Sequence, residues 1–574
     1  MDWGEDKLKP SGTLEQSSSA NVGPSTALRV VKGIVPSLQN LHIQDLLPPS
    51  EQRPVARLAH GLDRALFNPG VYWLKDPRSR VYNFNPYVEE VPDVREFDFS
   101  RVSGFIKSSH DGDLQSLAKT HGAKFAGSTS SLTGMLSQIY LALSRARDPN
   151  VSVLSEAFLH EQRSFSYAQR IPVSVVLWHR DGVYSTDSYS HSSDSDKNIL
   201  TWMGTMLEKF LTLSEDDFKP LMRASPSILE TDSRKEAYRY AKIGNYVTRA
   251  QLDCYDPRVP GSGIFDIKTR ACLPIRKDIM NWEENSGYLL KHSHGLLESF
   301  EREYYDLVRA AFLKFSFQAR IGNMDGMFMA YHNTDRIFGF QYIPLEEMDE
   351  RLYGNSAVGP LVFEKCMQIL EATMLEIVHH FPKQNIECIF EAVPSSEKLL
   401  VWASPLDWKG EKDAKPIVEL AVTLRSLVDG KIVSGEHVAD KLPHAPWTVK
   451  YSIAQSSASA AVLRTRAGEA LERQRLPWRL PAGVGIQQMA ELWEAMDFGG
   501  GDLRASKAVF EPRRFVKPGN EIRALRRVAR RGRKETEEHE QQYAGEKKVV
   551  WGELVQERAE GHLSHRVQNH AQDD

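Results

Sequence analysis

The stretch YVTRAQLDCYDPRVPGSGIFDIKTRA, residues 246–271, decides how this chain is expected to fold. Two strand-like runs flank residues 255–263, which hold two prolines and two glycines and are typical of a hairpin loop. Side chains alternate between the two faces of a strand, so antiparallel pairing of the runs brings Asp253, Asp266 and Lys268 together. The sequence therefore predicts an Asp and an Asp-x-Lys motif on adjacent strands at the edge of a sheet.

These three side chains favour a metal site. Neighbouring carboxylates repel each other, and burying them side by side is costly unless a cation lies between them. Mg²⁺ (or Mn²⁺) takes one or two carboxylates and leaves its other positions to water and phosphate oxygens. Lys268 lies on the same side of its strand, where it can position or deprotonate a water for attack on a phosphodiester. The alternative is an exposed hairpin with ordinary cross-strand pairs, and the short motif does not decide between them.

The flanking sequence supplies helices and further strands. Residues 198–212 have helical apolar spacing, with Glu208 at the margin of the apolar stripe. The other expected elements are a strand at 236–242, a long amphipathic helix at 285–317 and strands at 327–331 and 337–343. The predicted order is helix, three strands, long helix, strands.

This order, with Glu208, Asp253 and Asp266-x-Lys268, resembles the core of the PD-(D/E)XK nuclease superfamily. Longer stretches resemble, more specifically, a fungal mitochondrial protein family required for messenger-RNA 5′-end processing and RNA turnover. They include HGLDRALFNPGVYWLKDPRSRVYNF (60–84), KIGNYVTRAQLDCYDPRVPGSGIFDIKTRACLPIR (242–276) and ESFEREYYDLVRAAFLKFSFQARIGNMDG (298–326). The resemblance covers roughly residues 55–450.

The resemblance implies an α/β (α+β) fold with a restriction-endonuclease-like core, an αβββαβ mixed sheet flanked by helices. With composition and periodicity it predicts five regions: a disordered segment 1–50, an N-terminal α/β region 51–197, the nuclease-like core 198–345, an α/β extension 346–510 and a charged tail 511–574, disordered or helical. Whether the extension continues the nuclease sheet or forms a second layer is open at this point.

Carried over position by position, the resemblance places Asp253 as the isolated acid, Asp266 and Lys268 as the D-x-K pair and Glu208 as the helix glutamate. Leu252 precedes Asp253 where the superfamily name has proline. The implied metal ligands are Asp253, Asp266, Glu208 and the carbonyl of Ile267. Three cations beyond the motif are expected to seat the RNA backbone, with solvated surface charge as the alternative: Arg270, Arg276 and Lys277.

The implied function is a Mg²⁺-dependent ribonuclease, 5′ to 3′ in direction, that acts on single-stranded mitochondrial RNA in the matrix or at the inner membrane. Exonucleolytic and endonucleolytic cleavage are both open at this point. The alternative is a non-catalytic RNA-binding adaptor that recruits processing factors or the mitochondrial RNA polymerase. The first residues, MDWGEDKLKP, are acidic where a mitochondrial presequence is rich in arginine, so no presequence is evident.

Net charge, cysteine spacing and apolar runs limit the classes of protein to which this chain can belong. The formal net charge of -4 requires RNA contact to come from a local patch. The four cysteines show no CxxC spacing, which indicates neither a zinc site nor a disulfide framework. No run of 18 apolar residues is present, so no transmembrane helix is expected. The basic run within 521–534 suits RNA or peripheral membrane association, and a charged tail is the alternative.

Three shorter motifs predict local structure. GSTSSLTG at 127–134 suits either phosphate binding at a helix N-terminus or plain N-capping. Aromatic and basic residues alternate at 67–86 and suit either RNA contact or a hairpin packed on the core. Residues 171–187 predict a hairpin that turns at Asp181 and Gly182.

Overall fold

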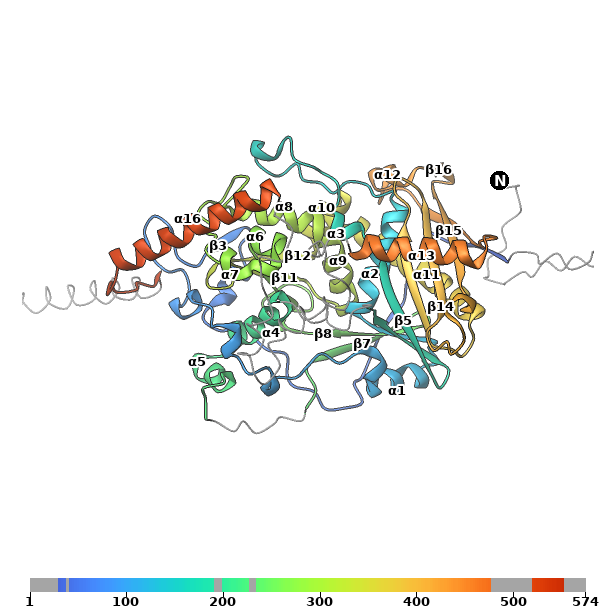
Figure 1. The fold of residues 1–574 in the computed structure, drawn as a ribbon, viewed down its shortest axis with the longest axis horizontal. Coiled ribbons are helices and arrows are strands. Elements are labelled where there is room, and N and C mark those ends of the chain that lie inside the picture. Colours follow the sequence, from blue (N-terminus) through green and yellow to red (C-terminus); the bar gives the residue numbers. More distant parts are fainter. Residues whose placement is uncertain (1–28, 38–40, 190–198, 227–233, 476–518, 552–574) are drawn as a thin grey trace, which may run out of the picture.

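The computed structural model describes residues 29–37, 41–189, 199–226, 234–475 and 519–551. This part of the chain is a mixed α+β fold built on two sheets. One sheet has 12 strands, in the order β1-β17-β15-β14-β13-β5-β6-β4-β8-β7-β2 with β16 beside β15. The other has five, in the order β3-β12-β11-β10-β9. In Figure 1 the strands β5, β14 and β15 lie to the right, β3 lies to the left below α16, and β11 and β12 lie near the centre.

The centre of the large sheet is the hairpin predicted at residues 171–187. Strands β5 (Val173–Arg180) and β6 (Val183–Ser188) pair antiparallel around Asp181 and Gly182. Both turn residues have positive φ, 52° and 86°, as a two-residue hairpin turn requires. Strand β4 (Phe125–Ser128) runs parallel to both of its neighbours, β6 and β8.

The C-terminal extension adds its strands to the large sheet, beside β5 of the N-terminal region, and not to the small sheet. Strand β13 (Ile386–Ala392) pairs with β5, and β14 (Lys398–Pro405), β15 (Val418–Val428) and β17 (Trp447–Gln455) follow outward. The short β16 (Lys431–Val433) pairs with β15.

Part of the segment predicted to be disordered is strand. Residues 1–28 and 38–40 lie outside the described residues, but β1 (Val30–Val35) pairs with β17 at one edge of the large sheet. Strand β2 (Ile43–Leu46) pairs with β7 at the other edge. The prediction was wrong there because these strands depend on partners far along the chain.

The nuclease-like strands are divided between the two sheets. Strands β7 (Tyr238–Ile243) and β8 (Tyr246–Gln251) form an antiparallel pair in the large sheet. The chain then crosses over at Leu252 and Asp253, and β9 (Cys254–Tyr255) pairs antiparallel with β10 (Ile264–Ala271) in the small sheet. The predicted hairpin is present, but its first strand is broken at Asp253.

The small sheet supplies the parallel pair expected of an αβββαβ core. Strand β10 runs parallel to β11 (Gly326–His332), and β12 (Ile337–Pro344) and β3 (Val71–Trp73) complete the sheet antiparallel. The preceding helix α4 (Ile199–Thr212) buries the predicted stripe, including Met203, Met206 and Phe210.

The single long helix expected at 285–317 is wrong. The structure has α7 (Trp282–Asn285), an irregular segment, then α8 (Phe300–Ala310) and α9 (Phe312–Gly322). Gly295 has φ +127°, and the Ser299 hydroxyl accepts a hydrogen bond from the N–H of Arg302, so a new helix begins there. Amphipathic spacing alone did not reveal these breaks.

The other helices cover the sheets. They are α1 (Gly112–Thr120), α2 (Thr129–Leu143), α3 (Tyr167–Arg170), α5 (Glu215–Phe218), α6 (Leu273–Lys277), α10 (Leu345–Tyr353), α11 (Val358–His380), α12 (Gly435–Val438) and α13 (Ala460–Arg475). Helix α2 is buried along nearly its whole length and packs against α9 and α11. It is therefore the central helix of the main hydrophobic core.

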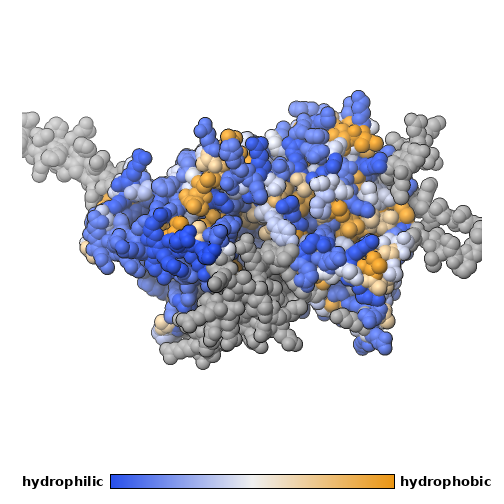
Figure 2. All heavy atoms as spheres, turned by 45° about the horizontal axis from the view of Figure 1, so that its top comes forward, coloured by the Kyte–Doolittle hydropathy of each residue, from blue (hydrophilic) through white to orange (hydrophobic). Residues whose placement is uncertain are grey.

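The basic run near the C-terminus lies in a docked helix. Helix α16 (Asn520–Gln542) lies against α6 and α7, and its Ile522, Leu525 and Ala529 are buried (Figure 1). Arg526 and Arg530 pair with the chain's own Asp278 and Glu284. Figure 2 shows a mostly hydrophilic face with scattered hydrophobic patches. Among the described residues, no helix is long and apolar enough to cross a membrane.

Candidate active site

One cavity brings together all four side chains that the sequence predicted to be catalytic. It has a volume of about 340 Å³ and is lined by α4, β8, the crossover after β8, β10, α9 and the first turn of α2. Glu208, Asp253, Asp266 and Lys268 all line it. The break at Asp253 explains the position of the cavity, since it lies where the chain passes from one sheet to the other.

The charged form of Asp253 is destabilised by this arrangement. Its Oδ2 accepts a hydrogen bond of 3.1 Å from the N–H of Ile267. Burial, and then the charges of Asp266 and Glu208, raise the pKa of Asp253 well above its ordinary value. Carboxylates that repel each other in this way are the arrangement that a bound cation stabilises.

Asp266 is held from two sides. The side-chain amide of Gln318 on α9 donates a hydrogen bond of 2.6 Å to Oδ1. The ammonium of Lys268 lies 2.5 Å from Oδ2, an oxygen that makes no hydrogen bond among the described residues. Burial lowers the pKa of Lys268, but the charges of Asp266 and Asp253 outweigh it and the pKa is raised. Only 2% of the Asp266 side chain is exposed, so its orientation is fixed.

Glu208 lies on α4 opposite these strands. Its Oε1 is 3.0 Å from the ammonium of Lys209, which also lies 3.7 Å from Glu236. Burial lowers the pKa of Lys209, but the charges of Glu208 and Glu236 prevail and raise it. Glu208 is thus at the cavity, as predicted, with a lysine of its own helix as its present partner.

The donor set suits a hard divalent cation, because carboxylate oxygens are the ligands that Mg²⁺ and Mn²⁺ prefer. As the side chains stand, however, no group of three or more His, Cys, Asp or Glu in the described part of the chain is close enough to hold a metal. Lys268 and Lys209 lie against two of the carboxylates instead. A cation would compete with these ammonium groups for the same oxygens.

The three cations predicted to seat RNA are not among the residues that line the cavity. Arg276 pairs with Asp306 and Glu303, and Arg270 lies 3.5 Å from Glu303. Burial and the charge of Arg276 lower the pKa of Arg270 to about 10. Lys277 pairs with Glu521 on α16. These contacts connect β10, α6, α8 and α16, and they lend no support to the predicted RNA contact.

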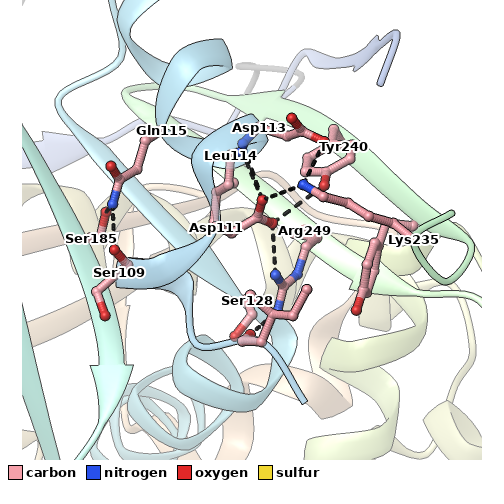
Figure 3. Close-up of polar contacts among 12 residues, drawn as sticks. Ser109, Asp111, Asp113, Leu114, Gln115, Ser128, Ser185, Lys235, Tyr240 and Arg249 are labelled. Carbon is pink, nitrogen blue, oxygen red and sulfur yellow. Dashed lines mark hydrogen bonds and ion pairs between the residues drawn. The ribbon is translucent and has the colours of Figure 1, made fainter. Parts of the chain in front are cut away.

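Arg249 on β8 is a further residue of the cavity, and no local motif marks it. Its guanidinium is 2% exposed, lines the cavity and donates to Asp111 Oδ2 at 2.7 Å (Figure 3). The ammonium of Lys235 lies 3.2 Å from the other oxygen of Asp111. Burial raises the pKa of Asp111, but Arg249 and Lys235 outweigh it and hold that pKa below its ordinary value.

Gln318 was found only through the structure. Gln318 lies in a helix 52 residues beyond Asp266, and no local motif marks it. At 127–134 the N-capping alternative is confirmed, because Ser128 and Ser131 form a capping box at the start of α2. The hairpin alternative at 67–86 is supported as well, since β3 joins the small sheet and Tyr82 and Phe84 are buried.

The fold and the site together define a class. The helix α4, the strands β7, β8–β9 and β10, the helices α8 and α9 and the parallel strand β11 follow the αβββαβ order of the PD-(D/E)XK nuclease core. Comparison with known proteins gives the family. Residues 105–375 match the family described as mitochondrial protein Pet127, and the chain belongs to this family.

Two relatives carry informative names. The chain is 38% identical over 352 residues to the Schizosaccharomyces pombe mRNA degradation protein pet127, mitochondrial, a match that covers 60% of this chain and 67% of the relative. It is 39% identical over 344 residues to the Saccharomyces cerevisiae putative mitochondrial translation system component PET127, covering 56% of this chain and 41% of the relative. The relatives and the family are mitochondrial.

Among solved structures, the chain is similar to two Rai1 proteins at 10% identity and a TM-score of 0.25. One is Candida albicans Rai1 in complex with pU5 and Mn²⁺, matched over 76% of this chain and 100% of that one. The other is Scheffersomyces stipitis Rai1 with (3′-NADP)⁺ and calcium ion, matched over 61% and 90%.

Proposed function

We propose that this chain is a metal-dependent ribonuclease that acts 5′ to 3′ on single-stranded mitochondrial RNA in 5′-end processing and degradation. One observation carries the proposal: Glu208, Asp253, Asp266 and Lys268, from three separate elements, all line one cavity. The mitochondrial setting and the RNA substrate are supported by the names of the relatives.

The residues divide into ligands and positioning groups. Asp253 and Asp266 would hold Mg²⁺ (or Mn²⁺), together with Glu208 and the Ile267 carbonyl. A bound cation of this kind stabilises the charge that develops on the oxygens of the phosphodiester. Gln318 fixes Oδ1 of Asp266 through its 2.6 Å hydrogen bond and leaves Oδ2 facing Lys268. Lys268 orients the attacking water.

A second candidate function is a non-catalytic RNA-binding adaptor that recruits other processing factors or the mitochondrial RNA polymerase. It is favoured by the contacts that Lys268 and Lys209 make with Asp266 and Glu208, since these pairs balance much of the acidic charge without a cation. A protein with either function could act at the matrix face of the inner membrane.

The test is cleavage of end-labelled single-stranded RNA carrying either a 5′-monophosphate or a 5′-hydroxyl, in Mg²⁺, Mn²⁺ or EDTA. The purified full chain is compared with the double variant Asp266→Ala/Lys268→Ala. The matched control is Asp216→Ala/Lys219→Ala, which removes an exposed Asp–Lys pair 3.6 Å apart on another part of the chain.

Loss of about two or more orders of magnitude of cleavage in EDTA and in the site variant, with the control unchanged, supports the nuclease. The preferred 5′ end and the order of product release give the direction. If the wild type does not cleave in either metal and binds RNA as tightly as the site variant, the adaptor is correct.

A further inference from the structure

A large aromatic side chain stands exposed at the proposed active-site cavity. Phe105 lies in the connection between short helical turns at Phe99–Arg101 and Ser108–His110, and 66% of it is exposed. It lines the same cavity as Asp253, Asp266 and Lys268. Folding buries little of this ring, so the hydrophobic core does not explain its position.

The connection that carries Phe105 is fastened to the strand that leads to Asp253. Arg249 on β8 donates through Nη2 to the carbonyl of Ile106 and through Nη1 to Asp111. The Arg249 guanidinium carbon lies 4.6 Å from the ring centre of Tyr238 and 5.9 Å from that of Phe105.

Arg249 is therefore held on several sides at once. Figure 3 shows its guanidinium pointing toward Asp111, with Lys235 on the other side of that carboxylate. A buried arginine whose fork is committed to two acceptors is rigid. It fixes the main chain next to Phe105 relative to the strand that ends at the candidate metal ligands.

We propose that Phe105 is a stacking platform for one unpaired base of the RNA, next to the phosphate that lies at Asp253 and Asp266, and that Arg249 is the positioning residue for that platform. The proposal rests on the proposed function and names its substrate class. Stacking on an aromatic ring is open to every base, so the platform selects single strands without reading their sequence. A fully paired end offers it no free base.

The test is RNA binding by the full chain in EDTA, which prevents turnover, with a single-stranded oligonucleotide that carries 2-aminopurine at its 5′-terminal positions in turn. Stacking on an aromatic ring quenches this base. The variants are Phe105→Ala, Phe105→Trp and Arg249→Lys. Phe67→Ala is the matched control, because Phe67 is a 42% exposed phenylalanine with Arg258 4.7 Å from its ring and does not line the cavity.

The expected result is quenching at one position, which Phe105→Ala abolishes together with a roughly 5- to 100-fold loss of affinity. Phe105→Trp keeps both signals, and Phe67→Ala changes neither. An abasic nucleotide at the quenched position weakens binding to the wild type by the same factor, and to Phe105→Ala by no more. Arg249→Lys, checked for folding by thermal unfolding, loses the quenching although Phe105 is present.

The proposal is overturned if Phe105→Ala binds and quenches like the wild type, or if blunt duplex RNA competes as well as the single strand. Its failure and that of the nuclease proposal are distinguishable. If the chain cleaves RNA with metal and Phe105→Ala binds RNA like the wild type, only the platform proposal fails. If RNA binding depends on Phe105 but the chain shows no metal-dependent cleavage, only the nuclease proposal fails.

Discussion

Filling the cavity at Gly204 should separate stability from activity. Gly204 lies in the interior of α4 and lines the cavity. A Cβ atom built there would meet only Thr269 Oγ1, at 3.9 Å, which is ordinary van der Waals contact. The substitution Gly204→Leu therefore fits the helix and directs a side chain into the space beside β10.

The two effects have opposite signs. Replacing a helix-interior glycine with leucine stabilises the fold by about 0.8 kcal/mol, which raises Tm by only about 1 °C in a chain of this size. The added isobutyl group takes the place of three to four waters, about 100 Å³ of the 340 Å³ cavity. RNA that needs this space should lose at least tenfold in kcat/KM, about 1.4 kcal/mol of transition-state stabilisation.

The assay compares thermal unfolding with cleavage of end-labelled RNA, and Gly468→Leu is the control. Gly468 lies in the interior of α13, and nothing lies within 4 Å of its added Cβ. It should gain similar stability with unchanged cleavage. If Gly204→Leu cleaves RNA within twofold of the wild type, the cavity is not the RNA site. If its Tm falls by several degrees, the space is not open.

Three further outcomes are expected. Gln318→Leu removes the 2.6 Å hydrogen bond to Asp266 and should lower kcat about 10- to 100-fold in the cleavage assay, because a mispositioned ligand costs that much; an unchanged kcat would show that Gln318 plays no part. Gly532→Ala places a Cβ 2.3 Å from the carbonyl oxygen of Gly287, so α16 should pack less tightly against its neighbours. The free energy of unfolding in urea should fall by roughly 1–3 kcal/mol, and hydrogen exchange should become faster in that helix alone. Burial lowers the pKa of His332 from 6.5 to about 3, so the unfolded chain binds a proton at a higher pH than the folded chain does. The free energy of unfolding therefore falls by about 1.4 kcal/mol per pH unit as the pH drops below 6.5. His332→Gln should flatten this dependence between pH 6.5 and 5, and equal slopes in the two proteins would contradict it.

Local periodicity identified most of the individual elements. The strands β7, β8, β10, β11 and β12 and the helix α4 lie within a few residues of their predicted ranges, because alternation and helical spacing record which face is buried. The helix at 285–317 was wrong for the same reason: an amphipathic pattern continues across Ser299 and Ala311, where only backbone geometry interrupts the helix.

Pairing between distant segments was beyond the sequence. Strand β1 joins β17 across more than 400 residues, and β13 joins β5, which merges the C-terminal extension with strands of the N-terminal region. Hydrogen bonds between main chains carry no residue code, so nothing in residues 30–35 names their partner. The docking of α16 through Arg526 and Asp278 is a second case, since a basic run has the same composition whether it is bound or free.

The sequence by itself determined which groups are available for chemistry. Asp253, Asp266 and Lys268 follow from residue type and from alternation along two neighbouring runs of the chain, which are local properties, and the family resemblance added Glu208. The tertiary structure alone decided that the strand breaks at Asp253, that Gln318 holds Asp266, and that Arg249 fastens the segment bearing Phe105 beside the same cavity. The contacts of Gln318 and Arg249 join residues 52 and 143 positions apart, and the packing of two sheets against α2, α4 and α9 brings them together.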